Sequence, residues 1–324
     1  MHISTRTQTS TSVLQAADRV AELSAIVAII RSGAISPIHS LSTLLDQVGS
    51  AAALLELNAA SWSSLGGTSQ QQLLRPVTKD DLDRASADVE AWLADGLDVR
   101  SVLDASYPVD LRTIFNRPPL LFIAGTWNSE KDSRSVAIVG TRKPSVEGER
   151  RAQRLARELV AAGYTILSGL AAGIDTAAHT AALDAGGRTV AVMGTGIRKR
   201  YPTANRALAD KILASGGALM SQFFPDQPPT KWTFPMRNVV MSGLSLATVV
   251  IEAAETSGAR MQARIALEHG RAVFVPSSLV HAHEWARRYT VEGVYGTRAI
   301  EVSSAEEVAK RLDGVSMSDS LATA

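Results

Sequence analysis

Residues 136–173, VAIVGTRKPSVEGERRAQRLARELVAAGYTILSGLAAG, contain the alternation from which the architecture of this chain follows. The apolar run Val136–Val139 is followed by a glycine turn and by an amphipathic helix expected over Val146–Ala162. A second run, Thr165–Ser168, leads into another glycine-rich turn. Continuous apolar runs of this kind are typical of parallel strands that are buried on both faces. The stretch therefore predicts a strand–helix–strand unit of a parallel sheet.

The same alternation extends in both directions, from Leu120 to about Leu312. Further helices are expected after Gly173, Asn205 and Gly258. This pattern predicts an α/β fold with a parallel sheet covered on both faces. The seven runs that qualify as strands are Leu120–Ala124, Val136–Val139, Thr165–Ser168, Thr189–Met193, Ala218–Ser221, Ala247–Glu252 and Ala272–Val275.

The chain upstream of this region is predicted to be helical. Apolar clusters in residues 13–78 are separated by Ser-Gly and Ser-Pro pairs, and we expect a small helical domain there, of the SAM or helix-hairpin kind. A further helix is expected over Asp80–Ala94, with Asp80 as its cap. The α/β domain then occupies residues 79–312, and residues 1–12 and 313–324 are expected to be disordered tails.

The composition is that of an ordinary globular protein. The 324 residues are 45% hydrophobic and 20% charged, and this length allows about two domains. The net charge of +1 means that any nucleic-acid binding has to come from a local basic patch. There is no cysteine, and no apolar run approaches the roughly 18–20 residues of a membrane span. We therefore expect a cytoplasmic protein that contacts no membrane.

Loops that leave three of the expected strands are rich in glycine. Val139 is followed by Gly140-Thr141-Arg142-Lys143, Ser168 by Gly169-Leu170-Ala171-Ala172-Gly173, and Met193 by Gly194-Thr195-Gly196. In a parallel sheet these loops lie at one edge, where ligands bind, and glycine lets backbone amides approach a phosphate closely. Together they predict an anion or nucleotide pocket, although each glycine alone also fits a tight turn. Neither the P-loop motif nor a complete dinucleotide fingerprint is present.

Cations follow the same loops. Such a cluster can neutralise a phosphodiester backbone, but for the run Arg198–Arg200 alone an exposed, solvated face is the favoured interpretation. Lys231-Trp232-Thr233-Phe234 lies in an expected Pro-rich loop, Asp226–Pro235. It joins one cation to two aromatic rings, the combination that holds single-stranded nucleic acid. The alternative is that both rings anchor this loop to the core.

These residues resemble one known family, the DNA-processing proteins DprA/Smf. Val136–Arg142 is similar to the family's opening strand and Gly-Ser-Arg turn, and Ser168–His179 closely resembles its most distinctive motif. The likeness covers about Asp80 to Leu312. Further matching segments are Tyr107-Pro108, Arg117–Phe122, Val192–Gly196, Tyr201-Pro202, Phe234–Asn238, Gly243–Ser245, Val250–Ala253 and Ser257-Gly258.

The resemblance implies an extended Rossmann-like, doubly wound and mostly parallel sheet that binds single-stranded DNA in a basic pocket. It also implies a homodimer that helps to load a RecA-type recombinase onto incoming DNA in natural transformation. By position, Arg142 would bind a DNA phosphate, while Lys231 and Phe234 would be the pocket's lysine and base-contacting phenylalanine. The residues predicted to form the DNA- or nucleotide-binding site are Gly140, Thr141, Arg142, Lys143, Ser168, Gly169, Gly173, Asp175, Gly194, Gly196, Lys231, Phe234, Arg237 and Asn238.

A nucleotide-binding sensor, or a phosphoribohydrolase-like enzyme on the same fold, is the alternative function. Asp175 and His179 are four residues apart and would share a helix face near the pocket, although a cap and a core hydrogen bond are their plainer roles. The chain lacks the Pro-Gly-Gly-x-Gly-Thr-x-x-Glu signature of those hydrolases, and Val239 replaces an arginine of the DprA pattern. His281 and His283 have no cysteine nearby. We therefore predict a binding protein with no catalytic residue, no cofactor and no metal.

Overall fold

The structure is a computed structural model that describes residues 16–33, 35, 37–57 and 76–312. It divides into two compact units, one from residues 1–36 and 44–91 and the other from residues 37–43 and 92–324. The expected domain boundary lay at residues 78–79, whereas this division falls inside a helix. Both expected tails lie outside the described residues.

Helices make up the described part of the first unit. They are α1 (Ala16–Ser32), α3 (Ala51–Glu56) and most of α5 (Lys79–Ala94), and α2 (His39–Val48) is divided between the units. The expected cap at Asp80 is wrong. Thr78 caps α5 instead, because its amide donates to Asp81 Oδ2 (3.0 Å) and the Asp81 amide donates to Thr78 Oγ1 (3.2 Å), a reciprocal capping box. Buried side chains of this unit include Leu23, Ile26, Val27, Leu45, Leu54 and Val89.

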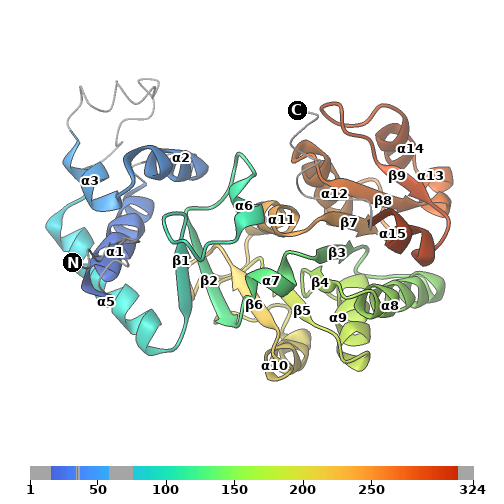
Figure 1. Cartoon of the computed structure of the whole chain (residues 1–324), viewed down its shortest axis with the longest axis horizontal. Helices are drawn as coiled ribbons and strands as arrows, with labels where there is room; N and C mark the ends of the chain where they lie inside the picture. The colour runs from blue at the N-terminus through green and yellow to red at the C-terminus, as the bar shows by residue number, and fades with distance from the viewer. Residues whose placement is uncertain (1–15, 34, 36, 58–75, 313–324) are drawn as a thin grey trace, which may run out of the picture. The chain divides into compact units, whose positions relative to one another are not determined.

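A nine-stranded sheet organises the second unit, with the strand order β1-β2-β6-β5-β4-β3-β7-β8-β9 (Figure 1). The pairs β1–β2 and β2–β6 are antiparallel, and the other six pairs are parallel. Because β3 pairs with β4 on one side and β7 on the other, the chain winds outward in both directions from β3. The predicted Rossmann-like, doubly wound and mostly parallel sheet is confirmed. The strands are β1 (Asp98–Ser101), β2 (Leu120–Gly125), β3 (Ser135–Val139), β4 (Thr165–Ser168), β5 (Thr189–Val192), β6 (Ala218–Ser221), β7 (Ala247–Val250), β8 (Ala272–Pro276) and β9 (Ile300–Val302).

All seven predicted strands are present, but the two at the ends of the sheet were missed. β1 contains Asp98 and Arg100, and β9 has only three residues, one of them Glu301. Edge strands pair on one side only and expose part of their surface, so they carry charges and lack the continuous apolar run of a central strand. Their sequences therefore give no strand signal of their own.

Helices cover both faces of the sheet (Figure 1). α8 (Val146–Ala161), α9 (Ile174–Asp184) and α10 (Arg206–Ala214) lie on one face, and α11 (Thr233–Leu244) and α12 (Gly258–Glu268) lie on the other. The predicted helix over Val146–Ala162 is confirmed to within one residue. The other short helices are α6 (Val109–Arg112), α7 (Ser129–Asp132), η1 (Thr203–Asn205), α13 (Ser277–Ala282), α14 (Glu284–Val291) and α15 (Ala305–Leu312).

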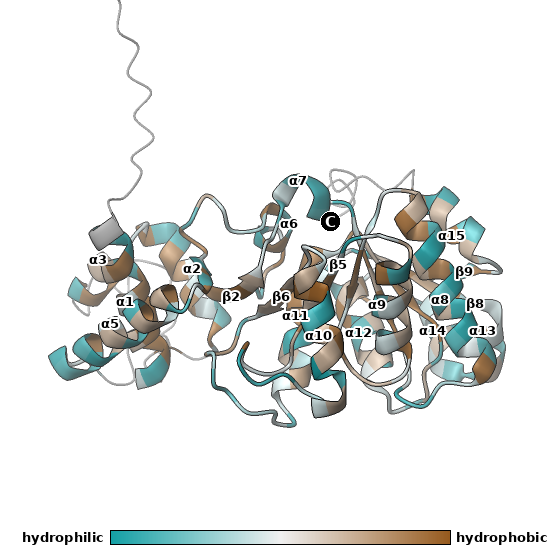
Figure 2. Cartoon of the chain, turned by 90° about the horizontal axis from the view of Figure 1, so that it is seen from below, coloured by the Kyte–Doolittle hydropathy of each residue, from teal (hydrophilic) through white to brown (hydrophobic). Residues whose placement is uncertain are grey.

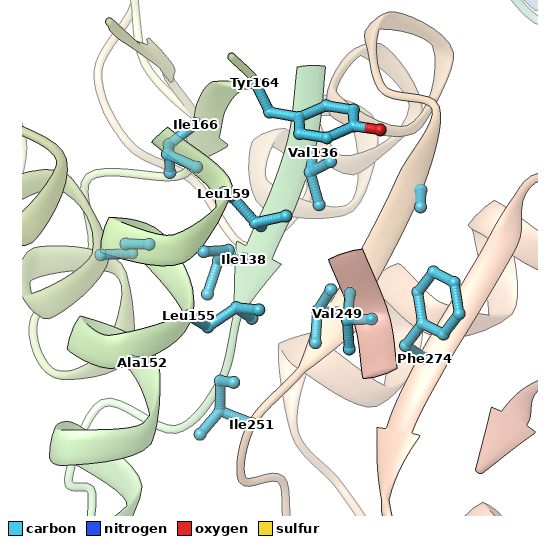
Figure 3. Packing of buried hydrophobic residues seen from close by; sticks show 14 of the residues in the cluster. Val136, Ile138, Ala152, Leu155, Leu159, Tyr164, Ile166, Val249, Ile251 and Phe274 are labelled. Atoms are coloured by element: carbon cyan, nitrogen blue, oxygen red, sulfur yellow. The ribbon is translucent and has the colours of Figure 1, made fainter. Parts of the chain in front are cut away.

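The main core lies between α8, α9, α15 and the sheet. Figure 3 shows Leu155 and Leu159 of α8 packed toward Ile138, Ile166 and Val249 of the strands, all of them buried. Apolar colour is concentrated on the central strands and polar colour on the helices around them (Figure 2). None of the described helices combines the length and the apolar character needed to cross a bilayer.

Candidate functional site

A cavity of about 450 Å³ lies where β3 ends, beside the beginnings of α11 and α12. In an open parallel sheet, this edge at the topological switch between β3 and β7 is where ligands bind. The cavity brings together eight of the predicted site residues: Gly140, Thr141, Arg142, Lys143, Asp175, Phe234, Arg237 and Asn238.

A cation and two aromatic rings form the exposed side of this cavity. The guanidinium carbon of Arg142 lies 5.6 Å from the centre of the Phe234 ring, and the Tyr201 ring centre lies 5.9 Å from that of Phe234. Arg142 and Lys143 are exposed, Tyr201 is 42% exposed, and Phe234 is half-buried. No carboxylate among the described residues pairs with Arg142 or Lys143. These groups therefore present unpaired positive charge beside flat aromatic surface. Tyr201 was not among the predicted site residues, because only the fold brings its loop against Phe234.

Lys231 and Trp232 extend this surface outside the cavity. Lys231 is exposed and Trp232 is 78% exposed, so the alternative in which Trp232 anchors the loop to the core is wrong. The Pro-rich loop also ends earlier than expected, because α11 begins at Thr233. Pro235 is compatible with the first helical turn, where an amide has no partner within the helix. Phe234 is thus held by a helix, with Gly194 directly beneath it: a Cβ atom at Gly194 would lie 2.6 Å from the ring.

Arg237 is buried and faces inward, in contrast to Arg142. Its side chain is 8% exposed, donates to Val192 O (2.7 Å) and to Asn238 Oδ1 (3.1 Å), and fills the space where a Gly169 side chain would be. Burial of the nearby Asp175 carboxyl raises its pKa, and the positive charge of Arg237 opposes this shift. Arg237 therefore supports the cavity floor.

The glycine loops are held together by their own backbone contacts. Asp175 Oδ2 accepts hydrogen bonds from the amides of Gly169 (3.0 Å) and Ala171 (3.3 Å), and the Gly196 amide donates to Gln227 O (2.9 Å). Gly173 has φ of +81° and leaves no room for a Cβ atom against Thr141 O. These glycines allow loops to pack closely, and the amides of Gly169, Ala171 and Gly196 are not free for a phosphate. The remaining predicted site residues do not line the cavity: they are Ser168, Gly169, Gly173, Gly194, Gly196 and Lys231.

The start of α8 already holds an anion. The Glu252 carboxylate, just after β7, accepts hydrogen bonds from the Ser145 amide (2.9 Å) and from the Ser145 hydroxyl. Ser145 in turn caps α8 by accepting from the Gly148 amide (2.9 Å). In dinucleotide-binding folds a phosphate occupies the corresponding helix N-terminus. Here a carboxylate of the protein lies there.

In the run Arg198–Arg200, both arginines have ion-pair partners, whereas Lys199 is exposed and has no ion pair within the described part of the chain. Arg198 pairs with Asp226 (2.9 Å) and with Asp95, and Arg200 pairs with Asp210. The pairing of the two arginines favours the interpretation of Arg198–Arg200 as an exposed, solvated face.

Asp175 and His179 bond to different groups. His179 is fully buried, its Nδ1 atom lies 2.7 Å from Thr189 Oγ1, and burial lowers its pKa to about 3. Asp175 holds the loop amides named above. Among the described residues, no three histidine or carboxylate side chains lie close enough to hold a metal ion.

The model of one family, DNA recombination-mediator protein A, matches residues 98–313, which is more than half of the chain. The chain belongs to this family. DNA recombination-mediator proteins similar to it include the DNA processing protein DprA of Bacillus subtilis, 37% identical over 221 residues, which are 64% of this chain and 74% of that protein. The DprA protein of Streptococcus pneumoniae is 43% identical over 185 residues, 56% of this chain and 63% of that protein. The chain thus matches only part of each relative. Both relatives are DNA processing proteins.

Solved structures of the family share the fold. The crystal structure of Streptococcus pneumoniae DprA has a TM-score of 0.67 at 30% identity and covers 88% of this chain and 96% of that chain. DNA processing protein A from Helicobacter pylori has a TM-score of 0.58 at 24% identity, with coverage of 67% and 96%.

Proposed function

We propose that this DNA recombination-mediator protein binds single-stranded DNA on the surface formed by Arg142, Lys143, Tyr201 and Phe234. The observation that carries the proposal is that exposed cations without an ion-pair partner among the described residues lie beside accessible aromatic rings at one cavity. Stacking on an aromatic side chain contributes about 1–3 kcal/mol per base, and each cation neutralises a phosphate. DNA processing protein A from Helicobacter pylori has a single-stranded DNA binding mode, which supports the same role here.

Lys231 and Trp232 extend this binding surface in the proposal. A tryptophan that is 78% exposed loses the benefit of burial, and an exposed lysine beside it supplies a phosphate contact. We further propose, from the family resemblance, a cytoplasmic homodimer that loads a RecA-type recombinase onto the bound strand.

We propose a binding protein and not an enzyme. His179 is inaccessible, and Asp175 is engaged by amides, so neither is placed to exchange a proton with a ligand. The Glu252 carboxylate at the start of α8 repels a nucleotide phosphate from that position, which counts against the nucleotide-sensor alternative.

The test is a titration of a fluorescent oligothymidylate, followed by anisotropy at low and moderate salt. Arg142→Ala and Lys143→Ala should each weaken binding and reduce the salt slope by roughly 0.7, the value for one phosphate contact on a single strand. Phe234→Leu, which keeps an apolar group above Gly194, should weaken binding about tenfold at both salt concentrations, because it removes a stacking surface.

Arg157→Ala is the matched control. Arg157 is an exposed cation of α8 that lines neither this cavity nor any other described one. Equal affinity of the parent and all three site variants would refute the proposal. Competition by a mononucleotide as effective as by the oligonucleotide would favour the sensor or enzyme alternative.

A further inference from the structure

The loop that follows β4 contains a leucine in a strained backbone conformation. Leu170 has a φ of +59°, in the left-handed region that residues other than glycine rarely adopt. Its side chain is fully buried in an apolar cluster that includes Ile197 and Ile212. A residue keeps such a conformation only where its surroundings hold it there. The contacts of Leu170 and its neighbours therefore show what fixes the loop of residues 169–171.

Asn205 bonds directly to this strained residue. Its Nδ2 atom donates to Leu170 O (2.8 Å) and to Thr176 Oγ1 (2.8 Å). The Thr176 hydroxyl gives its one proton to Ala171 O (2.8 Å), so it can only accept from Asn205. This requirement sets the orientation of the Asn205 amide, with its nitrogen toward the loop. The loop of residues 169–171 is thus held through two successive carbonyl oxygens.

A simpler role was open to Asn205. It occupies the N-cap position of α10, where an asparagine side chain usually accepts a hydrogen bond from one of the first helical amides. Here the side chain makes no such cap and is turned inward, 9% exposed, to Leu170. The bond to the loop therefore replaces a local interaction that would stabilise α10.

The loop that Asn205 holds also supports the helix that carries Phe234. The Arg237 side chain occupies the space where a Cβ atom of Gly169 would lie, directly before Leu170. Arg237 follows Phe234 by three residues in α11, so the two side chains are neighbours on one face of that helix. The position of the Phe234 ring is therefore set against the loop of residues 169–171.

Asn205 connects the same loop to Tyr201. It ends η1, which begins two residues after Tyr201, and the Asn205 amide donates to Pro202 O (2.9 Å). The Tyr201 ring centre lies 5.9 Å from that of Phe234, and the two ring planes are tilted by 49°. Two rings from distant segments therefore rest on one support.

Two other contacts hold the segment of Tyr201 to itself and to α10. Thr195 Oγ1 donates to Lys199 O (2.5 Å), and Arg200 pairs with Asp210 of α10. Neither contact reaches the loop of residues 169–171. Loss of the Asn205 side chain would therefore leave this segment intact but would release it from the support that it shares with α11.

We propose that Asn205 is a positioning residue of the DNA-binding surface: it fastens η1 to the strained loop and so sets Tyr201 at stacking distance from Phe234. This inference rests on the proposed function. The Asn205 side chain is buried and does not itself contact DNA. It acts through the Tyr201 ring, because a pair of rings that is already ordered costs less to bind than a pair that must first be ordered.

A double-mutant cycle with fluorescent oligothymidylate tests the proposal. Tyr201→Ala should weaken binding about tenfold, as expected for the loss of one stacked base. Asn205→Ala should weaken binding about fivefold in the parent and should have no further effect in the Tyr201→Ala background. Thr176→Val, which removes one of the two partners of the Asn205 amide, should act in the same direction and more weakly, and it replaces Asn205→Ala in the cycle if that variant does not fold.

Asn128→Ala is the matched control. The Asn128 side chain also holds a turn of the chain, because its Oδ1 atom accepts from the amides of Glu130 and Lys131 at the start of α7, but it does not line the cavity beside Arg142. This variant should leave oligothymidylate binding unchanged, which separates a general loss of stability from a displaced ring.

Fluorine NMR of the protein labelled with 3-fluorotyrosine reads the ring position without DNA. The Tyr201 resonance is assigned by its loss in Tyr201→Phe, and it should shift in Phe234→Leu because the two rings are in contact. Asn205→Ala should shift or broaden this resonance and should leave those of the buried Tyr107 and Tyr164 unchanged. Asn128→Ala should leave it in place.

The failures of the two proposals can be told apart. An equal loss of affinity upon Asn205→Ala in both backgrounds, or an unchanged Tyr201 resonance, would overturn the positioning role. Absence of oligothymidylate binding by the parent would refute the DNA-binding proposal, and the fluorine spectrum would then decide whether Asn205 positions Tyr201.

Discussion

At the scale of single residues, Gly148 and Glu252 form a pair in which the absence of a side chain is essential. A Cβ atom at Gly148 would lie under 3.0 Å from the Glu252 carboxylate, which holds the Ser145 amide and hydroxyl at the start of α8. Glu252 therefore keeps its place only because position 148 has no side chain.

We predict that Gly148→Ala destabilises the protein by about 1 kcal/mol. The lost hydrogen bonds to a charged group cost roughly 1.5–3 kcal/mol, and the better helix propensity of alanine returns about 1 kcal/mol. In a Glu252→Ala background the same change should become stabilising, because the obstruction is gone. Urea denaturation of the four proteins measures this, and the same sign in both backgrounds would contradict it. Gly258→Ala, in the first turn of α12 with nothing within 4 Å, should not destabilise the protein.

At the scale of elements, one ion pair fastens α7 to the start of the neighbouring strands. Asp132 is fully buried and accepts from Arg188 Nε (2.6 Å), Thr165 Oγ1 (3.1 Å) and the Asn128 amide (2.7 Å). Arg188 also donates to the carbonyl oxygens of Gly216 and Thr126. The pair therefore joins the segments that precede β3, β5 and β6 to the first residue of β4 and to Thr126, just after β2.

We predict that Asp132→Ala costs roughly 3 kcal/mol of unfolding free energy, since it leaves the half-buried Arg188 without its carboxylate. Arg264→Ala, which breaks an exposed pair with Glu268 on α12, should cost less than about 1 kcal/mol. Chemical denaturation compares the two. Similar costs would show that the buried pair is not what fastens these segments.

At the scale of the whole molecule, the buried His179 and the half-buried His269 link folding to pH. Burial lowers the pKa of His179 to about 3 and that of His269 to about 4, from 6.5 in the unfolded chain. The unfolded state therefore binds protons first as the pH falls. Stability should be lost below about pH 6.5, by up to about 1.4 kcal/mol per pH unit for each histidine, down to its folded pKa.

His179→Leu isolates one of these contributions, because other groups titrate equally in both proteins. We expect the variant to lose stability less steeply than the parent between about pH 6.5 and pH 5, by about 1.4 kcal/mol per pH unit. Urea midpoints across this range measure the difference. Parallel curves would refute the assignment of this proton uptake to His179.

The sequence by itself determined the α/β class, the seven central strands and the helix over Val146–Ala161, because a buried strand and an amphipathic helix are encoded in local periodicity. It also pointed to Arg142, which follows the strand Val136–Val139 in a glycine turn, and to Phe234, which begins the segment Phe234–Asn238 that resembles the family. The edge strands carry no such pattern. Only the tertiary structure decided which cations are free. Arg200 forms an ion pair with Asp210 across a loop, and the buried Arg237 side chain packs against Gly169. The position of Tyr201 beside Phe234 likewise depends on a contact between distant segments, which local sequence does not specify.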